Sequence, residues 1–224
     1  FGTSIRSTIS SLELLLARSD DLGSLPSEAI RSALFANPST FQARWLSLNG
    51  KELIRFDKNF AGIERVPDSQ LQDKSDRNYF QAMQQLAVGQ IYMSRFDLNV
   101  EHGQIEVPFR PTVRIGLRLD SGYVLANLDL TQLLARINSN YIPLYDTWLV
   151  STNGDWLIAP EESLEWGFMF GEPKRIQDTL EYQGLEQLLG GRAATVIDYE
   201  SSNLLISQPL NLGSGDLARS VLAE

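Results

Sequence analysis

Two stretches of the chain share one pattern of apolar and polar positions. Residues 45–54 and 148–158 each contain an apolar run, an Asn-Gly pair, two further residues and a Leu-Ile pair. Asn-Gly between apolar runs predicts a β-hairpin, because a type I′ turn needs positive φ at both central residues. The two pairs are separated by about the length of one small domain, which favours two similar modules in tandem. Two unrelated hairpins are the alternative, since Asn-Gly is a common pair.

Helical spacing of apolar residues occurs in four further segments. Residues 3–18 follow a Ser-rich start that offers N-caps, and a second helix is predicted over 26–36. A third covers 76–86, and a fourth begins near residue 130. The apolar stripe of the third helix consists of Tyr79, Phe80, Met83 and Leu86.

Strand patterns fill the rest of the first module. The hairpin strands around Asn49-Gly50 are followed, after the third helix, by three more predicted strands: Gln90–Phe96, Thr112–Leu119 and Gly122–Leu128. A tight turn at Asp120-Ser121-Gly122 joins the last two. Residues 97–111 are expected to form a long loop. The order of hairpin, helix and three strands predicts an antiparallel sheet of about five strands flanked by helices.

The second module is predicted less completely. It starts near Tyr145 with its own hairpin, and residues 160–192 form a long insert with a helix over 180–189. Strands are predicted over 194–199 and 204–210. The tail, residues 216–224, is compatible with either a strand or a short helix.

These elements predict an α+β fold with a long N-terminal helix and two tandem modules, each an antiparallel sheet of about five strands flanked by helices. The expected divisions are a helical stalk over 1–39, one module over 40–139 and a second over 140–224. The chain opens with Phe1-Gly2 and has no Met before them, so we expect an excised segment of a longer protein.

Composition and charge exclude several classes of function. The chain of 224 residues is 43% hydrophobic with a mean hydropathy of −0.16, which is typical of a folded globular protein. A net charge of −9 and a pI near 4.7 disfavour nucleic acid and anionic membrane surfaces as partners. The sequence contains no Cys and no apolar run long enough to span a bilayer.

Catalytic and metal-binding patterns are also missing from the sequence. The single histidine, His102, lies in a polar loop, where a solvated side chain is expected. No second His and no Cys are present to complete a metal site or a nucleophile–base pair. The number of acids leaves a carboxylate-only hydrolase formally open, but no constellation of residues points to one. We therefore expect no catalytic residues, no metal and no cofactor.

Several short motifs occur in an order that resembles one known group of proteins. They are Asp76–Phe80, Gly89–Asn99, Glu106–Pro111, Leu125–Leu130 and Trp166–Met169. The chain resembles the extracytoplasmic double PAS-like sensor domains, also called double Cache or tandem PDC domains. These occur on bacterial histidine kinases of two-component systems, on diguanylate cyclases and on chemoreceptors. The similarity covers about residues 40–210.

The resemblance implies a membrane-distal module that holds a ligand and a membrane-proximal module that relays the signal. It also implies a periplasmic location and transmembrane helices just outside both ends of this chain. Relatives that bind amino acids carry an Arg-x-Trp-Tyr motif on the pocket helix and an Asp after the last strand. Arg77, Tyr79 and Phe80 match the helix motif and Asp129 matches the acid. Tyr79 replaces the Trp and Phe80 lacks a hydroxyl, which puts specificity for amino acids in question.

Strand alternation points to the same region independently, since every second side chain of a strand shares a face. One face of the three later strands is hydrocarbon. The other face mixes aromatic, hydroxyl and charged groups: Tyr92, Ser94, Phe96, Thr112, Arg114, Gly116, Asn127 and Asp129. An Arg and an Asp on one face suit a small zwitterion or carboxylate, because Arg–carboxylate pairs give both strength and orientation.

Plainer interpretations apply to the same residues. Arg77 is able to cap its own helix, Arg114 and Asp129 to form a structural ion pair, and Tyr79 and Phe80 to be ordinary core. We nonetheless predict a ligand site from Arg77, Tyr79, Phe80, Tyr92, Ser94, Phe96, Arg114, Asn127 and Asp129. The predicted function is sensing of an amino acid, carboxylate or amine. The alternative is an interaction module that senses a periplasmic binding protein, and residues 3–18 offer a surface for a homodimer.

Overall fold

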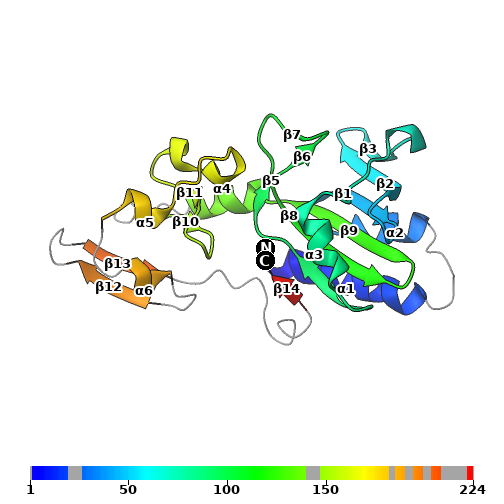
Figure 1. Ribbon diagram of the computed structural model, residues 1–224, viewed down its shortest axis with the longest axis horizontal. Helices are drawn as coiled ribbons and strands as arrows, with labels where there is room; N and C mark the ends of the chain where they lie inside the picture. Colours follow the sequence, from blue (N-terminus) through cyan, green and yellow to red (C-terminus); the bar gives the residue numbers. More distant parts are fainter. Residues whose placement is uncertain are drawn as a thin grey trace. The chain divides into compact units, whose positions relative to one another are not determined.

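The chain folds into two compact units (Figure 1). The structure is a computed structural model that describes residues 2–19, 27–139, 147–181, 185–189, 194–198, 203–207 and 221–223. Unit 1 comprises Phe1–Phe96, Arg110–Leu130 and Leu212–Glu224, and unit 2 comprises Asp97–Phe109 and Thr131–Asn211. Among the described residues, no helix is both long and apolar enough to cross a membrane.

Unit 1 is built on one sheet with the strand order β14-β4-β8-β9-β1-β2-β3. Neighbouring strands are antiparallel, except that β14 runs parallel to β4. The strands are β1 (Thr40–Leu46), β2 (Glu52–Asn59), β3 (Gly62–Arg65), β4 (Ile91–Met93), β8 (Pro111–Leu119), β9 (Gly122–Asp129) and β14 (Val221–Ala223). The strands predicted over 112–119 and 122–128 are confirmed, and that predicted over 90–96 is shorter, at Ile91–Met93. Part of the undecided tail is a strand.

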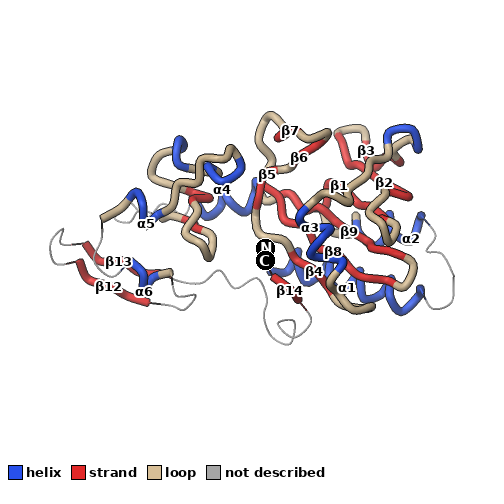
Figure 2. Tube along the Cα trace, in the orientation of Figure 1, coloured by secondary structure: helices blue, strands red, loops and turns tan. Residues whose placement is uncertain are grey.

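Helices cover both faces of this sheet (Figure 1). On one face lie α1 (Gly2–Ser19) and α2 (Ser27–Leu34), which contact β8 and β1. On the other lies α3 (Asn78–Gln84), preceded in the chain by the short 3-10 helix η1 (Asp68–Gln70). All three helices were predicted. Figure 2 shows the helices against the strands of unit 1 by colour.

The two faces differ in chemistry because residues alternate along each strand. The α1/α2 face is hydrocarbon and collects buried residues of strands and helices: Ile9, Leu12, Ile30, Leu34, Val113, Ile115, Leu117, Val124, Ala126 and Leu128. The α3 face has an apolar cluster under the helix, made of Leu46, Tyr79, Phe80, Met83, Leu86, Tyr92, Tyr123 and Leu125. Gly116 leaves room there, since a Cβ on it would lie 2.5 Å from Cε of Met83.

The hairpin turn at Asn49-Gly50 is longer than predicted. The amide of Gly50 donates to the carbonyl of Ser47 (3.1 Å), and the amide of Ser47 donates to the carbonyl of Lys51 (2.8 Å). Only Gly50 of the pair has positive φ, at 88°. The prediction of a two-residue type I′ turn is therefore wrong, because that turn needs positive φ at both central residues. The Ser47 hydroxyl accepts the amide of Lys51 (3.0 Å) and stabilises the longer loop.

The second hairpin repeats this hydrogen-bond pattern. The amide of Gly154 donates to the carbonyl of Ser151, and the amide of Ser151 donates to the carbonyl of Asp155, both at 2.9 Å. Gly154 has φ of 87°. In each case the glycine carbonyl accepts an amide from later in the chain, that of Lys74 before α3 in unit 1 and that of Ile176 in unit 2.

Unit 2 contains three separate two-stranded sheets in its described residues. They pair β6 (Val100–Glu101) with β7 (Gln104–Ile105), β10 (Leu149–Val150) with β11 (Trp156–Ile158), and β12 (Ala194–Asp198) with β13 (Asn203–Ser207). The sheet of about five strands predicted for the second module is therefore not seen among the described residues of unit 2. The predicted loop over 97–111 also carries strands, namely β5 (Asp97–Leu98), β6 and β7.

Short helices complete unit 2. They are α4 (Thr131–Ser139), η2 (Glu162–Leu164), η3 (Gly167–Met169), α5 (Ile176–Thr179) and α6 (Leu185–Leu188). The helix predicted over 180–189 is shorter, because Leu180 has extended backbone and ends α5. The core of unit 2 consists of Trp156, Ile176 and Leu185, with Trp148 packed edge-on against Trp156.

The two units differ from the expected divisions at 39/40 and 139/140. Residues 1–39 belong to unit 1, and Ile9 and Leu12 of α1 are buried within this chain. These two side chains are therefore not free for the predicted contact with a second copy. Residues 97–109 and 131–139 belong to unit 2 and not to the first module.

Candidate functional site

Three polar residues form a row across the α3 face of unit 1. Strand register places Gln42 of β1 opposite Asn127 of β9, and Asn127 opposite Arg114 of β8. All three are nearly fully buried. Arg114 and Asn127 were predicted site residues, and their shared face is confirmed by the register. Buried polar groups require hydrogen-bond partners, so the side chains of this row need partners within the protein.

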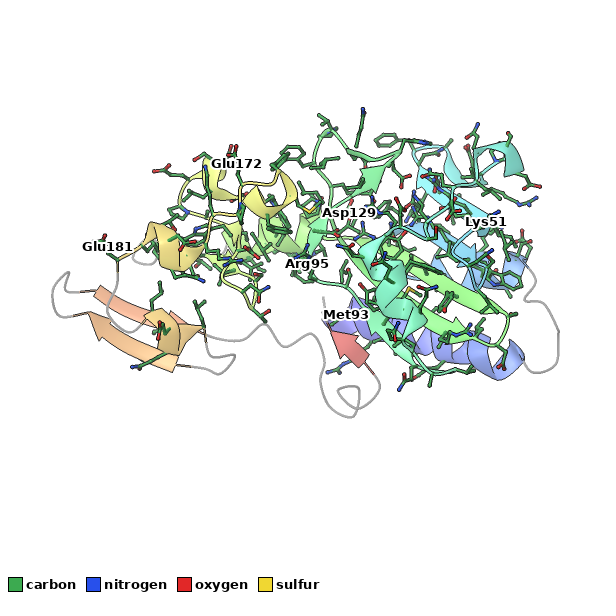
Figure 3. The ribbon with its side chains drawn as sticks, in the orientation of Figure 1. Lys51, Met93, Arg95, Asp129, Glu172 and Glu181 are labelled. Atoms are coloured by element: carbon green, nitrogen blue, oxygen red, sulfur yellow. The ribbon has the colours of Figure 1, made fainter. Side chains whose placement is uncertain are left out.

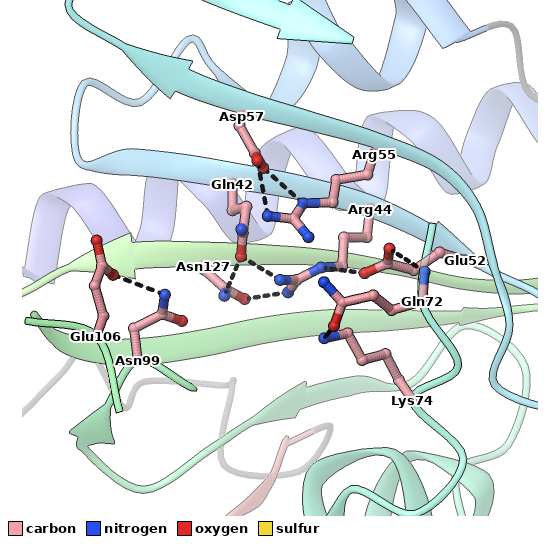
Figure 4. Close-up of polar contacts among 10 residues, drawn as sticks. All are labelled: Gln42, Arg44, Glu52, Arg55, Asp57, Gln72, Lys74, Asn99, Glu106 and Asn127. Carbon is pink, nitrogen blue, oxygen red and sulfur yellow. Dashed lines mark hydrogen bonds and ion pairs between the residues drawn. The ribbon is translucent and has the colours of Figure 1, made fainter. Parts of the chain in front are cut away.

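Arg44 supplies the centre of those contacts (Figure 4). Its side chain is 2% exposed and lies one step along β1 from Gln42 on the same face. Nε lies 2.8 Å from Oε1 of Glu52, Nη1 donates to Oδ1 of Asn127 at 3.3 Å, and Nη2 donates to Oε1 of Gln42. The amide of Asn127 also donates to Gln42, at 2.9 Å. One guanidinium thus joins strands β1, β2 and β9.

Glu52 extends this network to the segment that leads into α3. Its Oε2 accepts the backbone amide of Gln72 at 2.9 Å, and its own amide donates to the carbonyl of Gln72 at 2.9 Å. Lys74, which is also buried, donates from Nζ to Oε1 of Gln72 at 2.8 Å. Residues 71–77, here termed the α3 approach segment, are therefore attached to the sheet through polar contacts.

Tyr79 and Arg114 meet beside this network. The guanidinium carbon of Arg114 lies 5.2 Å from the centre of the Tyr79 ring, within the range of a cation–π contact. Burial raises the pKa of Tyr79, and the nearby positive charges of Arg44, Arg114 and Arg77 oppose that rise. The phenol therefore stays protonated and able to donate a hydrogen bond at neutral pH.

Arg77 occupies the N-cap of α3 but does not cap it with its side chain. Its carbonyl accepts the amides of Phe80 and Gln81 at 2.9 and 3.1 Å, as the first turn of a helix requires. The side chain is half-buried. Its charge contributes to the pKa of Tyr79, which places it near the site.

The hydroxyl of Ser94 is engaged with the backbone. It accepts the amide of Arg114 at 2.9 Å and donates to the carbonyl of Arg95 at 2.7 Å. The amide of Ser94 in turn donates to the carbonyl of Arg114 at 2.9 Å. Ser94 thus continues the pairing of β4 with β8 beyond Met93 and anchors the backbone of Arg114.

Phe80 and Tyr92 belong to the apolar cluster under α3. Both are completely buried, and Phe80 packs edge-on against Tyr123 with ring centres 5.2 Å apart. Phe96 is half-buried after the end of β4. Phe80 and Tyr92 lie in this apolar cluster, next to the polar row. The packing of Phe80 agrees with the plainer interpretation, in which it is an ordinary core residue.

Asp129 lies at the far end of β9 (Figure 3). It is opposite Thr112 in the register, and its Oδ2 lies 3.7 Å from Nε of Arg110. Both side chains of this pair are about one-third exposed, so the pair itself contributes little to stability. An ion pair of Asp129 with Arg114 was the plainer interpretation of these residues, and the ion pair observed for Asp129 is with Arg110.

The structure therefore brings Tyr79, Arg114, Asn127 and Ser94 together, with Arg77 near them and Asp129 at the strand end. Gln42, Arg44 and Glu52 were missed by sequence reasoning. The signal was present, because Gln42 and Arg44 alternate with Phe41, Ala43 and Trp45 along a predicted strand.

Most of the buried charged side chains of unit 1 are cations. Among its described residues, the buried charged side chains are the cations Arg44, Arg55, Lys74 and Arg114 and a single carboxylate, Glu52. Asp57, which is partly exposed, pairs with Arg55 at 2.7 Å. The described part of the chain holds no group of three or more His, Cys, Asp or Glu side chains suited to a metal.

Comparison with solved structures identifies the fold. A domain of a sensory box/GGDEF family protein from Vibrio parahaemolyticus is similar, with a TM-score of 0.72 and 21% identity over 96% of this chain and 86% of that chain. The extracellular domain of a histidine kinase matches with a TM-score of 0.61 and 19% identity, over 88% and 84%. The periplasmic sensory domain of the Campylobacter jejuni chemoreceptor Tlp1 matches with a TM-score of 0.57 and 11% identity, over 93% and 88%.

Comparison with families and curated sequences gives one match. No curated protein matches the chain in sequence. The family model described as "Bacterial histidine kinase, sensor domain" matches residues 28–188, which is well over half of the chain. The chain therefore belongs to the bacterial histidine kinase sensor domains and is an extracytoplasmic portion of a membrane receptor.

Proposed function

We propose that unit 1 is the ligand-sensing, membrane-distal module and that it binds a small molecule carrying a carboxylate. The single observation that carries the proposal is that the buried guanidinium groups of Arg44 and Arg114 lie on the α3 face beside Asn127 and Tyr79. Hydrogen bonds from a guanidinium to a carboxylate are charge-assisted and strong, so this arrangement favours an anionic guest.

The residues around this face suit a carboxylate in particular. Arg114 and Arg44 present planar guanidinium groups, which bind a carboxylate with two parallel hydrogen bonds. The protonated Tyr79 hydroxyl and the Asn127 amide supply neutral donors close by. Among the three predicted ligand classes, amino acids and carboxylates fit this charge and simple amines do not. Asp129 at the end of β9 is the acid that we assign to the ammonium group of an amino acid.

Binding is expected to produce a signal by shifting unit 1 between two arrangements. A ligand shifts such an equilibrium only by its difference in affinity for the two states. Because α1 packs on the opposite face of the same sheet, a change at β1 or β8 reaches that helix. We propose that unit 2 relays the signal and that the output is a histidine kinase or a diguanylate cyclase outside this chain.

The test is thermal unfolding of this chain with a panel of amino acids, mono- and dicarboxylates and amines, followed by calorimetry. A ligand at about 100 times its Kd stabilises the folded state by about 2.7 kcal/mol, which is easily measured. Arg114→Gln should weaken binding by about 10-fold to 100-fold, because a charge-assisted hydrogen bond is lost. Arg65→Gln is the matched control, since Arg65 forms an exposed pair with Asp68.

Two outcomes would contradict the proposal. If no carboxylate or amino acid raises the unfolding temperature, unit 1 is not a small-molecule sensor, and the interaction with a periplasmic binding protein becomes the leading hypothesis. If a ligand binds but Arg114→Gln and Arg65→Gln bind it equally well, the site lies elsewhere.

A further inference from the structure

The buried pair of Arg44 and Glu52 has an unusual position for a structural ion pair. Both side chains are essentially inaccessible, at 2% and 0% exposure, and Arg44 sits in the middle of the polar face that we assign to the ligand. Replacing a buried ion pair by apolar residues is often neutral or stabilising, so such a pair is weak support for a purely structural role.

The contacts of Glu52 give the pair a second property. One carboxylate oxygen lies 2.8 Å from Arg44, and the other accepts the amide of Gln72 in the α3 approach segment. The side-chain oxygen of Gln72 also accepts a hydrogen bond from the ammonium group of Lys74. The Glu52 side chain therefore makes two contacts at once: it pairs with Arg44, and it holds the α3 approach segment against the sheet.

A carboxylate from outside would compete with Glu52 for the same guanidinium. Exchange of one carboxylate for another keeps Arg44 paired, so it avoids most of the cost of leaving a buried cation without a counter-charge. After the exchange, the Glu52 side chain is no longer held by Arg44. It can then move away from the Gln72 amide, which loses its acceptor. Glu52 is the first residue of β2 and follows the exposed turn residue Lys51, so solvent is close to its backbone.

We propose that Arg44 recognises the carboxylate of the ligand. In the ligand-free chain, Glu52 occupies the same position on Arg44, and the ligand displaces it. Displacement of Glu52 loosens the α3 approach segment and converts binding into movement of α3. This inference rests on the proposed ligand site in unit 1, and it adds both the residue that selects for anions and the way in which binding is transmitted.

The first test uses acetate as the probe. Glu52→Ala removes the internal carboxylate and should lower the urea midpoint. Potassium acetate at tens of millimolar should restore the midpoint towards that of the wild-type chain, whereas potassium chloride at equal ionic strength should not. Asp57→Ala is the matched control, because it removes the carboxylate of the partly exposed Arg55 pair, where acetate should act no better than chloride.

The second test uses Glu52→Gln, which keeps the shape of the side chain and its acceptor for Gln72. Removal of the competing charge should tighten binding of any carboxylate found in the panel by at least tenfold. In the wild-type chain the same ligand should speed hydrogen exchange at the amide of Gln72 by about tenfold, while that of Val66, which donates to the carbonyl of Arg55, stays unchanged.

The outcomes separate this inference from the proposed function. Equal effects of acetate and chloride on Glu52→Ala, together with unchanged affinity in Glu52→Gln, would overturn the role of Glu52 even if the wild-type chain binds a carboxylate. Should Glu52→Ala fail to fold, Glu52→Gln and the exchange measurement decide alone. Rescue by acetate with no ligand found in the panel would support the carboxylate site at Arg44 and contradict sensing by the compounds tested.

Discussion

The guanidinium carbon of Arg114 lies 5.2 Å from the centre of the Tyr79 ring, and both side chains are buried. One residue comes from the middle of β8 and the other from the first turn of α3, so the contact joins the sheet to the helix over the polar face. A cation–π contact of this kind stabilises by about 0.5–2 kcal/mol when it is desolvated.

This contact leads to a prediction on alkaline pH. Burial raises the pKa of Tyr79 in the folded state above its unfolded value of about 10. The resulting stability is fully present below pH 10 and is lost as the pH rises through the folded-state pKa. We expect the free energy of unfolding of the wild-type chain to fall more steeply above pH 10 than that of Tyr79→Phe. Urea titrations between pH 8 and 11 measure it, and parallel curves would contradict it.

The first hairpin depends on Gly50 for two reasons. Its φ of 88° strains any other residue, and a Cβ would lie 2.8 Å from the backbone of Ser75. Gly50→Ala should cost about 1–2 kcal/mol for the left-handed backbone and about 1–3 kcal/mol more for the clash. Gly62→Ala, in the same unit, has a strained φ of 133° with nothing within 4 Å of its Cβ. Urea unfolding of both variants separates the two costs. An equal loss of unfolding free energy in the two variants would show that the clash with Ser75 contributes nothing.

The N-terminal helix is attached to unit 1 by a buried hydrogen bond. Nδ2 of Asn37 donates to Oγ1 of Thr8 at 2.8 Å, and Oδ1 of Asn37 accepts the amide of Ser39 at 3.0 Å. Asn37→Ala should destabilise the unit by about 1–3 kcal/mol, because it leaves a buried polar group without this partner. Combining it with Thr8→Val should cost less than the sum of the two single changes. Glu28→Gln, in an exposed pair with Arg31, should change stability by less than about 0.5 kcal/mol.

The core of unit 2 contains a similar polar contact. The indole Nε1 of the fully buried Trp156 donates to Oγ1 of Thr179 at 2.9 Å. Thr179→Val keeps the shape of the side chain and removes the acceptor, so it should destabilise unit 2 by about 1–3 kcal/mol. Thr152→Val, in the exposed second turn, is the control and should have little effect. Near-ultraviolet circular dichroism during thermal unfolding follows Trp156, and similar midpoints for the two variants would show that the hydrogen bond contributes nothing.

Much of unit 1 was predictable because its signals are local. The apolar stripe of residues 76–86 places Tyr79, Phe80, Met83 and Leu86 on one side of a helix, and all four are buried. Alternation in β8 and β9 correctly assigned Arg114 and Asn127 to one face. The turn type was not predictable from Asn-Gly alone, since the Ser47 hydroxyl favours a longer loop through contacts that composition does not reveal.

The site was predicted only in part, for a different reason. Arg114, Asn127 and Tyr79 share a face by alternation and helical spacing, but nothing in their own segments indicates that Arg44 and Glu52 join them. The Arg44 network depends on the register of β1 with both β2 and β9. Asp129 is a second example, because it pairs with Arg110, just before β8, and the pattern of its own strand does not indicate that partner.

By itself, the sequence determined the three helices of unit 1 and most of its strands, the hydrocarbon and polar faces of its sheet, the acidic charge and the resemblance to a sensor family. The short strand β3 was not predicted. Periodicity and local turn chemistry act over a few residues, so they can be read along the chain. Only the tertiary structure decided that the N-terminal helices pack with the first sheet, and that Arg44 of β1 and Glu52 of β2 form a buried ion pair. Those relationships join residues from distant parts of the chain, and strand register and packing, which no local pattern encodes, bring them together.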